Sequence, residues 1–170
     1  MKTIVTLLVF AGLALAQAPD WSTGASSAKA LQNQIKNNVI KSADKMTAEN
    51  FDFKATDAVR SYGAILAHIA DAQNNFCAAS LGEKNPAPGI EKSKKTKEEI
   101  SAALKESFAY CDKAYAALTD ANANESVKFF RGERARLGVL IFNTMHTWEH
   151  YGNLVTYMRL KGIVPPSSER

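Results

Sequence analysis

Apolar side chains recur every three or four positions over four stretches of the chain, which is the spacing of one face of an α-helix. The first face runs from Leu31 to Met46. The others lie within helices expected over Asp57–Leu81, from Thr96 to Leu118 and over Arg134–Lys161. No stretch alternates convincingly between apolar and polar residues, so we expect no strand. The pattern therefore predicts an all-α protein.

Residues that favour helix ends lie where the periodic stretches stop. Thr56 is expected to cap the second helix at its start, and Gly82 follows its end. Thr96-Lys97-Glu98-Glu99 is a capping box that opens the third helix. Gly162 ends the fourth helix. Each of these signals supports the helix boundaries that the apolar spacing predicts.

The connections between the helices bear on the topology. Segments 47–56 and 120–133 have no helical period, so we expect extended or irregular chain there. The connection 83–95 holds two prolines and a glycine, and at about 3.3 Å per residue it can span about 40 Å, the length of a 25-residue helix. An antiparallel pair of helices would not need so long a loop. We therefore predict a four-helix bundle with a long crossover between helices 2 and 3, in up-down-down-up order.

The N-terminal sixteen residues have the pattern of a secretory signal. Lys2 precedes the apolar run Ile4–Leu15, and Ala14-Leu15-Ala16 supplies the small residues that signal peptidase reads. The run is too short to cross a bilayer, which takes about 20 residues. We expect a signal peptide at 1–16, a single domain at 17–170, and export to a periplasm or to the medium.

The net charge of the chain gives little information about its function. The net charge is +4 and the pI about 9.0, but the densest cluster, Lys92–Lys97, runs directly into Glu98 and Glu99. Nucleic-acid binding needs a basic face with interleaved aromatic residues, which the sequence lacks. We expect no nucleic-acid partner and, after signal cleavage, no membrane partner.

The three histidines carry the candidate chemistry. His68 lies on the apolar face of the second helix, and His146 and His150 lie one turn apart on a single face of the fourth. A lone histidine on such a face is most often a core residue with a satisfied hydrogen bond. Three neutral imidazoles in one interior are costly unless a metal takes their lone pairs. Three nitrogen ligands beside an open position define a catalytic zinc site, and they also suit nickel, cobalt or iron(II).

A second motif overlaps the histidine pair. His146-Thr147-Trp148-Glu149-His150 matches the inverted zinc-protease pattern, in which Glu149 would be the general base. We disfavour this interpretation because few residues follow His150 and because Glu149 lies one position off the histidine face. A surface charge is the simpler explanation of Glu149.

The C-terminal helix carries the pattern His146-x-x-x-His150-Tyr151-Gly152-Asn153-Leu154, followed by Tyr157-x-Arg159, Gly162 and Pro165. This pattern resembles the C-terminal signature of the DinB/YfiT-like superfamily, and the resemblance extends over about residues 22–166. His68 matches the histidine of the second helix in that family, and Tyr151 stands where many members have another histidine. The resemblance implies the same crossover bundle, which is frequently dimeric in this family, so a homodimer is one expected assembly. It also implies a divalent metal, zinc or nickel, on His68, His146 and His150.

The resemblance leaves two classes of function open. Characterised relatives are thiol-dependent S-transferases and a maleylpyruvate isomerase, so one expectation is a metal-dependent hydrolase or S-transferase acting on an unidentified small molecule. The other is a non-catalytic, stress-associated periplasmic protein whose metal is structural. Asn143 and Asn153 are candidates to orient the site, and Tyr62 or Tyr157 to donate a proton. Each of the four is more simply an ordinary helix-face residue.

Cys77 and Cys111, the two cysteines of the chain, are predicted to form a disulfide between the second and third helices. An even count in an exported protein permits the bond. In an antiparallel pair of helices they would be offset by about 15 Å along the axis, whereas in the crossover arrangement they fall at similar heights. Two buried free thiols are the alternative.

Overall fold

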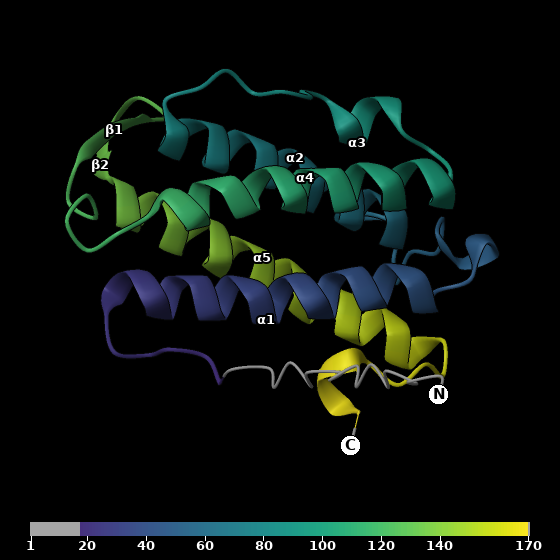
Figure 1. The fold of residues 1–170 in the computed structure, drawn as a ribbon. Coiled ribbons are helices and arrows are strands. Elements are labelled where there is room, and N and C mark those ends of the chain that lie inside the picture. Colours follow the sequence, from purple (N-terminus) through teal and green to yellow (C-terminus); the bar gives the residue numbers. More distant parts are fainter. Residues whose placement is uncertain (1–17, 170) are drawn as a thin grey trace, which may run out of the picture.

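The computed structural model describes residues 18–169, and these residues are mostly helical (Figure 1). The four long helices are α1 Gly24–Lys45, α2 Tyr62–Leu81, α4 Lys97–Ala117 and α5 Arg136–Leu160. The short elements are η1 Ala48–Asn50, α3 Ile90–Ser93, β1 Ser126–Phe129, β2 Gly132–Ala135 and η2 Pro166–Ser168. The expected signal peptide at 1–16 lies outside the described residues. Within 18–169, no helix is both long and apolar enough to cross a membrane.

The second helix begins five residues later than predicted. Its N-cap is Ser61, whose hydroxyl accepts a hydrogen bond from the Ala64 amide, and not Thr56. The main-chain amides of Tyr62 and Gly63 donate to the carbonyls of Phe53 and Phe51 at 2.9 and 2.8 Å. The preceding segment thus folds back over the start of α2 and replaces the first turn that the sequence suggested.

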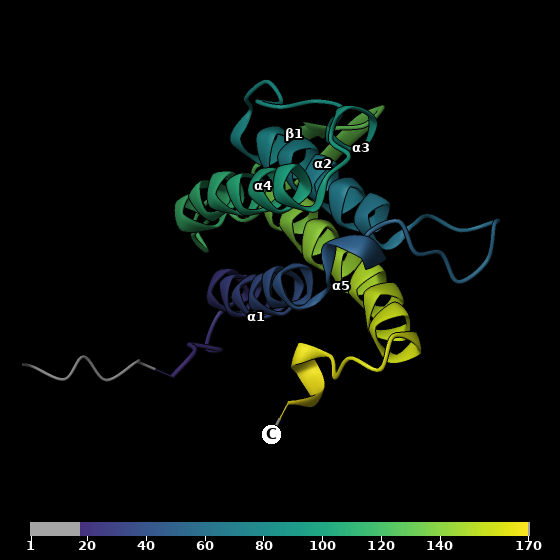
Figure 2. The same cartoon turned by 90° about the vertical axis from the view of Figure 1, so that its right-hand side faces the viewer.

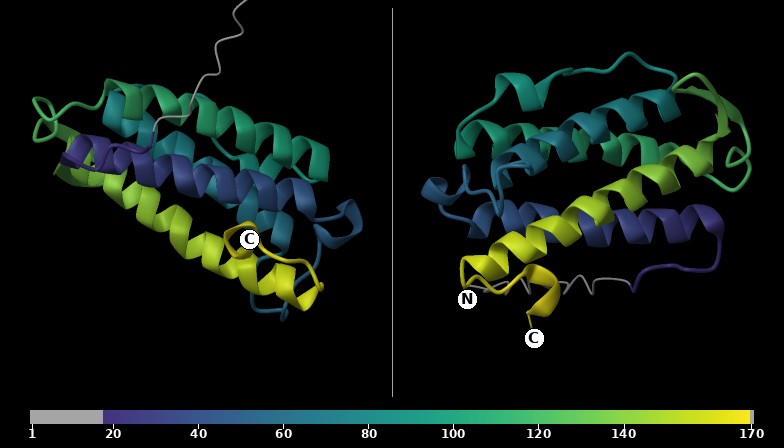
Figure 3. Two further views of the ribbon diagram at one scale, coloured as in Figure 1. Left: turned by 60° about the horizontal axis from the view of Figure 1, so that its bottom comes forward. Right: turned by 180° about the vertical axis from the view of Figure 1, so that it is seen from behind.

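The helices α2 and α4 run parallel. Near their starts, a methyl group placed on Gly63 would lie 3.3 Å from the Ile100 side chain. Near their ends, Cys77 and Cys111 form a disulfide with their Cα atoms 5.2 Å apart, so this prediction is confirmed. Figures 1 and 3 show α1 and α5 running in the opposite direction to this pair. The connection between α2 and α4 therefore passes along the molecule and carries α3 on its way.

The prediction of no strand is wrong. Segment 120–133, expected to be irregular, contributes β1 and the start of β2, which pair antiparallel from Ser126 with Ala135 to Phe129 with Gly132. The residues of β2 are all exposed, so the hairpin lacks the alternation by which strands are recognised. Because Arg134 belongs to β2, α5 begins two residues later than predicted. Segment 47–56, expected to be extended, contains the 3₁₀ turn η1.

The inner face of α1 differs from the predicted one at its first position. Leu31 is exposed, and the neighbouring Gln32 is buried in its place. From there the face continues as predicted through Ile35, Val39 and Ala43. An amide therefore enters the interior where a leucine was expected.

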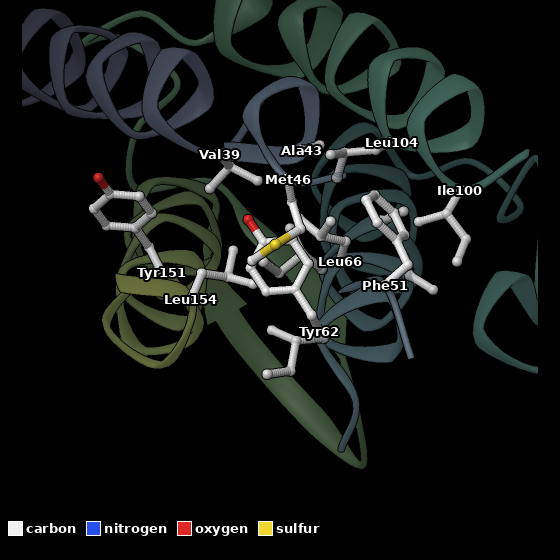
Figure 4. Packing of buried hydrophobic residues seen from close by; sticks show 14 of the residues in the cluster. Val39, Ala43, Met46, Phe51, Tyr62, Leu66, Ile100, Leu104, Tyr151 and Leu154 are labelled. Carbon is white, nitrogen blue, oxygen red and sulfur yellow. The ribbon is translucent and has the colours of Figure 1, made fainter. Parts of the chain in front are cut away.

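Side chains from all four long helices meet in the core. Figure 4 shows Met46, Tyr62, Leu66 and Leu154 converging, with Phe51 of the folded-back segment beside them. The rings of Phe51 and Tyr62 pack edge to face, with centroids 5.7 Å apart. Figure 2 shows that the C-terminal segment with η2 turns back beside α1 after α5 ends.

A chain of buried polar side chains crosses the four long helices. The buried polar network consists of Gln32 of α1, Gln73 of α2, Tyr115 of α4, and Asn143, Thr144 and Thr147 of α5. The Gln73 carboxamide accepts from Gln32 at 3.0 Å and from Asn143 at 3.1 Å, and it donates to Thr147 at 2.8 Å. Burial raises the pKa of the Tyr115 phenol to about 12, and its hydroxyl donates to the Leu140 carbonyl at 2.7 Å. The helices are thus joined by directed bonds as well as by apolar contact.

Candidate metal centre

The structure brings the three predicted histidines together between α2 and α5. One nitrogen of each ring lies within 4.8 Å of one nitrogen of both other rings. The Nε2 atoms of His146 and His150 are 3.1 Å apart. The His68 ring centroid lies 5.2 Å from that of His146 and 4.8 Å from that of His150. All three side chains are partly buried, so the cluster sits at the edge of the interior.

A carboxylate orients His68. The Glu91 Oε2 lies 3.1 Å from His68 Nδ1, and Glu91 Oε1 accepts from Arg60 Nε at 2.9 Å. Burial alone would raise the pKa of Glu91, but hydrogen bonds and charge from Arg60 and His68 outweigh it and hold that pKa below its ordinary value. An Nδ1 proton held by a carboxylate leaves the Nε2 lone pair free, and this pairing recurs behind metal-bound histidines.

The position of Glu91 is itself fixed from α2. Asp71, one turn after His68, accepts the main-chain amides of Gly89 and Ile90 on Oδ1, at 2.9 and 2.8 Å, and that of Glu91 on Oδ2 at 2.9 Å. Gly89 precedes α3 with a φ of 83°, in the left-handed region that favours glycine. A single carboxylate therefore anchors the crossover segment and sets Glu91 against His68.

Their surroundings disfavour the charged form of the two histidines of α5. Burial lowers the pKa of His146, and the charge of His68 adds to the shift. Burial lowers the pKa of His150 to about 4, with His146 and His68 adding to it. The Nδ1 atoms of both rings are buried without a hydrogen-bond partner among the described residues. Metals bind neutral imidazoles, and the Nε2 atoms of these two rings face one another, where an ion could take their lone pairs.

The donor set fits a divalent transition metal. Two histidine nitrogens on a tetrahedral zinc ion at 2.0–2.1 Å lie about 3.3 Å apart, close to the separation of His146 and His150. Within the described part of the chain, the group contains the three histidines and no carboxylate or thiol. Three nitrogen donors leave room for an exchangeable ligand, which distinguishes such a centre from a closed structural site.

Two cavities are bordered by the histidines. One, of about 470 Å³, is bordered by His68, His146, Phe76, Phe130 and Phe142, and we call it the phenylalanine cavity. The other, of about 310 Å³, is bordered by Arg60, Ile65, His150, Asn153 and Tyr157, and we call it the arginine cavity. Molecules from the solvent can therefore approach the centre.

The remaining candidates from the sequence divide into two groups. Asn153 and Tyr157 line the arginine cavity, where the Tyr157 hydroxyl donates to the Arg60 carbonyl at 2.7 Å. Asn143 and Tyr62, in contrast, do not serve the centre. Asn143 belongs to the buried polar network. The Tyr62 hydroxyl donates to the Ser42 carbonyl at 2.8 Å, and burial raises its pKa.

One further residue considered from the sequence lies outside the site, and three residues of the site were not predicted. Glu149 is exposed and is not part of the histidine group. The supporting residues Glu91, Asp71 and Arg60 were not predicted, because their contacts with His68 and with α3 are long-range. The one local signal was the position of Asp71, three residues after His68 on the same helix.

Four long helices, with a three-histidine cluster between α2 and α5, define a helical protein with a candidate metal centre. The profile of the DinB superfamily matches residues 33–154. That match covers more than half of the chain, which therefore belongs to the DinB superfamily.

Solved structures share the fold at low sequence identity. A DinB-like protein from Bacillus cereus aligns over 82% of this chain and 93% of its own, with a TM-score of 0.71 and 16% identity. One from Bacillus subtilis aligns over 85% and 99%, with a TM-score of 0.68 and 17% identity. A mycothiol-dependent maleylpyruvate isomerase aligns over 76% of this chain but 60% of its own, with a TM-score of 0.61 and 16% identity. No curated protein matches the sequence significantly.

Proposed function

We propose that this chain is a metal-dependent enzyme, a hydrolase or a thiol S-transferase, which binds one divalent ion through His68, His146 and His150. Zinc and nickel are the favoured ions because all three donors are imidazole nitrogens. The observation that carries the proposal is the cluster of three converging imidazoles, two of them with lowered pKa, which borders two cavities. The parallel α2 and α4 support the further proposal of a crossover four-helix bundle of DinB type.

The residues of the site have separate tasks in this proposal. The ion, when bound, supplies a Lewis acid that makes a water or thiol more acidic. Glu91 holds His68 in the tautomer that offers Nε2. Asn153 lines the arginine cavity beside His150, where its amide is available to a substrate. The mycothiol-dependent isomerase among the structural neighbours supports the thiol option.

The second candidate is a non-catalytic protein whose metal only stabilises the fold. Its support is the position of the histidines on both α2 and α5, because an ion bound to all three would join these two helices. The two cavities favour the enzyme, because a structural site needs no access from solvent.

Metal analysis tests the proposal. Purified wild-type protein incubated with Zn²⁺ or Ni²⁺ and then desalted is expected to retain one ion per chain. His146→Ala is expected to retain much less, because loss of one of three ligands weakens binding by orders of magnitude. Met145→Ala, an exposed neighbour on α5, is the matched control and should retain as much ion as the wild type.

Equal metal content in wild type and His146→Ala would refute the proposed site. If His146→Ala does lose the ion, cobalt-loaded wild type distinguishes the enzyme from the protein with a structural metal. An exchangeable position predicts that 2-mercaptoethanol changes the cobalt absorption spectrum, whereas a closed structural site predicts no change.

We also propose that the protein acts outside the cytoplasm, as residues 1–16 suggest. The disulfide between Cys77 and Cys111 supports this location, because such bonds persist mainly in oxidising compartments.

A further inference from the structure

We propose that the phenylalanine cavity binds the aryl group of a small anionic ligand whose donor atom reaches the histidines, and that Phe130 determines this preference. The inference rests on the proposed function and names its substrate class. Nothing in the family match or in the neighbours' names specifies an aryl ligand.

The cavity is walled by rings set at steep angles to one another. The centroids of Phe76 and Phe142 are 5.3 Å apart with their planes at 76°, and those of Phe76 and Phe130 are 5.9 Å apart at 75°. The planes of Phe130 and Phe142 meet at 87°. Aromatic pairs favour edge-to-face and offset contacts, so walls at these angles offer both faces and edges to an entering ring.

The same rings touch the metal centre. Phe76 packs edge to face on His146 with centroids 5.5 Å apart, and Phe142 stacks near the same imidazole at 6.4 Å. His68 and His146 both border the cavity. A ligand lying against the phenylalanines in this cavity therefore has its other end within reach of the histidines.

Phe130 occupies an unfavourable position for the protein alone. It lies in the two-residue turn of the hairpin with a φ of 53°, where glycine or asparagine is usual. Its side chain is 78% exposed. The Phe130 ring packs against the rings of Phe129 and Phe76, with centroids 4.3 and 5.9 Å apart, yet most of the residue remains open to solvent. Strained residues of this kind concentrate at binding sites, and contact with an apolar ligand would bury the exposed part of the ring.

Charge around the hairpin indicates the rest of the ligand. Arg131 and Arg134 border a neighbouring hollow on whose wall Phe130 and Phe142 also lie. Asn75, Asn85 and Asp71 form part of the border of the phenylalanine cavity, and the Asp71 carboxylate is already bound by the main-chain amides of 89–91. Two arginines beside this cavity, with its one bordering carboxylate so occupied, favour an anion that carries an aryl group over a cationic ligand.

Two hydroxamates that differ only in their substituent test the inference. Binding of benzohydroxamate and acetohydroxamate is measured calorimetrically on full-length protein, both cobalt-loaded and metal-free. Cobalt-loaded wild type is expected to bind benzohydroxamate about tenfold more tightly, the size of an added aromatic contact. Phe130→Asn, whose side chain suits a positive φ, is expected to lose this preference while its affinity for acetohydroxamate stays unchanged.

Two further variants serve as controls. Phe130→Tyr restores an aromatic ring and should keep the preference. Met145→Asn removes another exposed apolar side chain of the described surface and should behave as the wild type. Equal affinity of wild type for the two probes would overturn the inference, and so would a preference that survives in Phe130→Asn.

The metal-free arm separates this inference from the proposed function. If cobalt does not bind, the proposed function fails. The aryl site is then supported if metal-free wild type binds benzohydroxamate more tightly than Phe130→Asn does. It is overturned if the two proteins bind the probe equally or not at all.

Discussion

The imidazole of His150 shows how a single side chain of the candidate metal centre affects the stability of the fold. Burial and the neighbouring histidines lower its pKa from 6.5 to about 4. In the unfolded chain, where neither acts, His150 returns to its ordinary value. At a pH between these two pKa values, His150 is protonated in the unfolded state but not in the folded state.

It follows that the metal-free protein loses stability on acidification. Because the unfolded state binds more protons in this window, the free energy of unfolding should fall as the pH is lowered from 6.5 towards 4. Urea unfolding with a chelator present, at a series of pH values, measures this slope. The slope should be shallower in His150→Gln, which cannot titrate. A variant with the wild-type slope would show that His150 is not the group responsible.

At the scale of elements, α3 matters more than its four residues suggest. It sits in the crossover segment and holds Glu91 against His68, while the carboxylate of Asp71 binds the three amides at its start. This arrangement makes Asp71 a positioning residue that acts on the candidate metal centre through Glu91.

Removing the charge of Asp71 should therefore weaken metal binding. Asp71→Asn and Glu91→Gln are each expected to lower cobalt affinity by about tenfold or more, the effect typical of partners behind a metal ligand. The double variant should bind cobalt no more weakly than Glu91→Gln, because both changes act on one contact. Asp44→Asn, which removes an exposed carboxylate paired with Lys105, is the control. Fully additive losses would contradict the coupling.

The elements also show what a sequence reveals and what it does not. The long helices follow from apolar spacing and caps, and the three histidines follow because each lies on an inner face. Glu91 was not predicted because its role depends on long-range contacts with His68 and Asp71 of α2. The hairpin was not predicted because its strands are mostly exposed and its turn holds Phe130 in place of glycine. Local patterns report burial, whereas these features arise from tertiary contact or from function.

At the scale of the whole molecule, the disulfide joins the two parallel helices α2 and α4, which the crossover segment connects. Cys77 and Cys111 are separated by 34 positions in the sequence. Closing such a loop restricts the unfolded chain and stabilises the folded state by about 3 to 4 kcal/mol in the chain-entropy account. The bond lies near the ends of α2 and α4, away from the crossover residues that support His68.

Replacing both cysteines by alanine should therefore lower stability and spare the metal centre. We expect a loss of about 3 kcal/mol in the free energy of unfolding, with cobalt affinity unchanged. Urea unfolding of the double variant and of oxidised wild type measures the first, and cobalt titration the second. Wild type treated with reductant should match the variant. Equal stability of oxidised wild type and variant would contradict the prediction.

The buried polar network has a consequence for the precision of the histidine cluster. Apolar side chains fit many neighbours, so helices held by them alone could slide past one another by a turn, about 5.4 Å, at modest cost. Such a slip would strand the amides of Gln73 and Asn143, and each unpaired buried group costs about 1 to 3 kcal/mol. The network therefore fixes the axial register of α2 relative to α5. These two helices carry the histidines, so polar bonds deep in the core align the three imidazoles at the edge of the core.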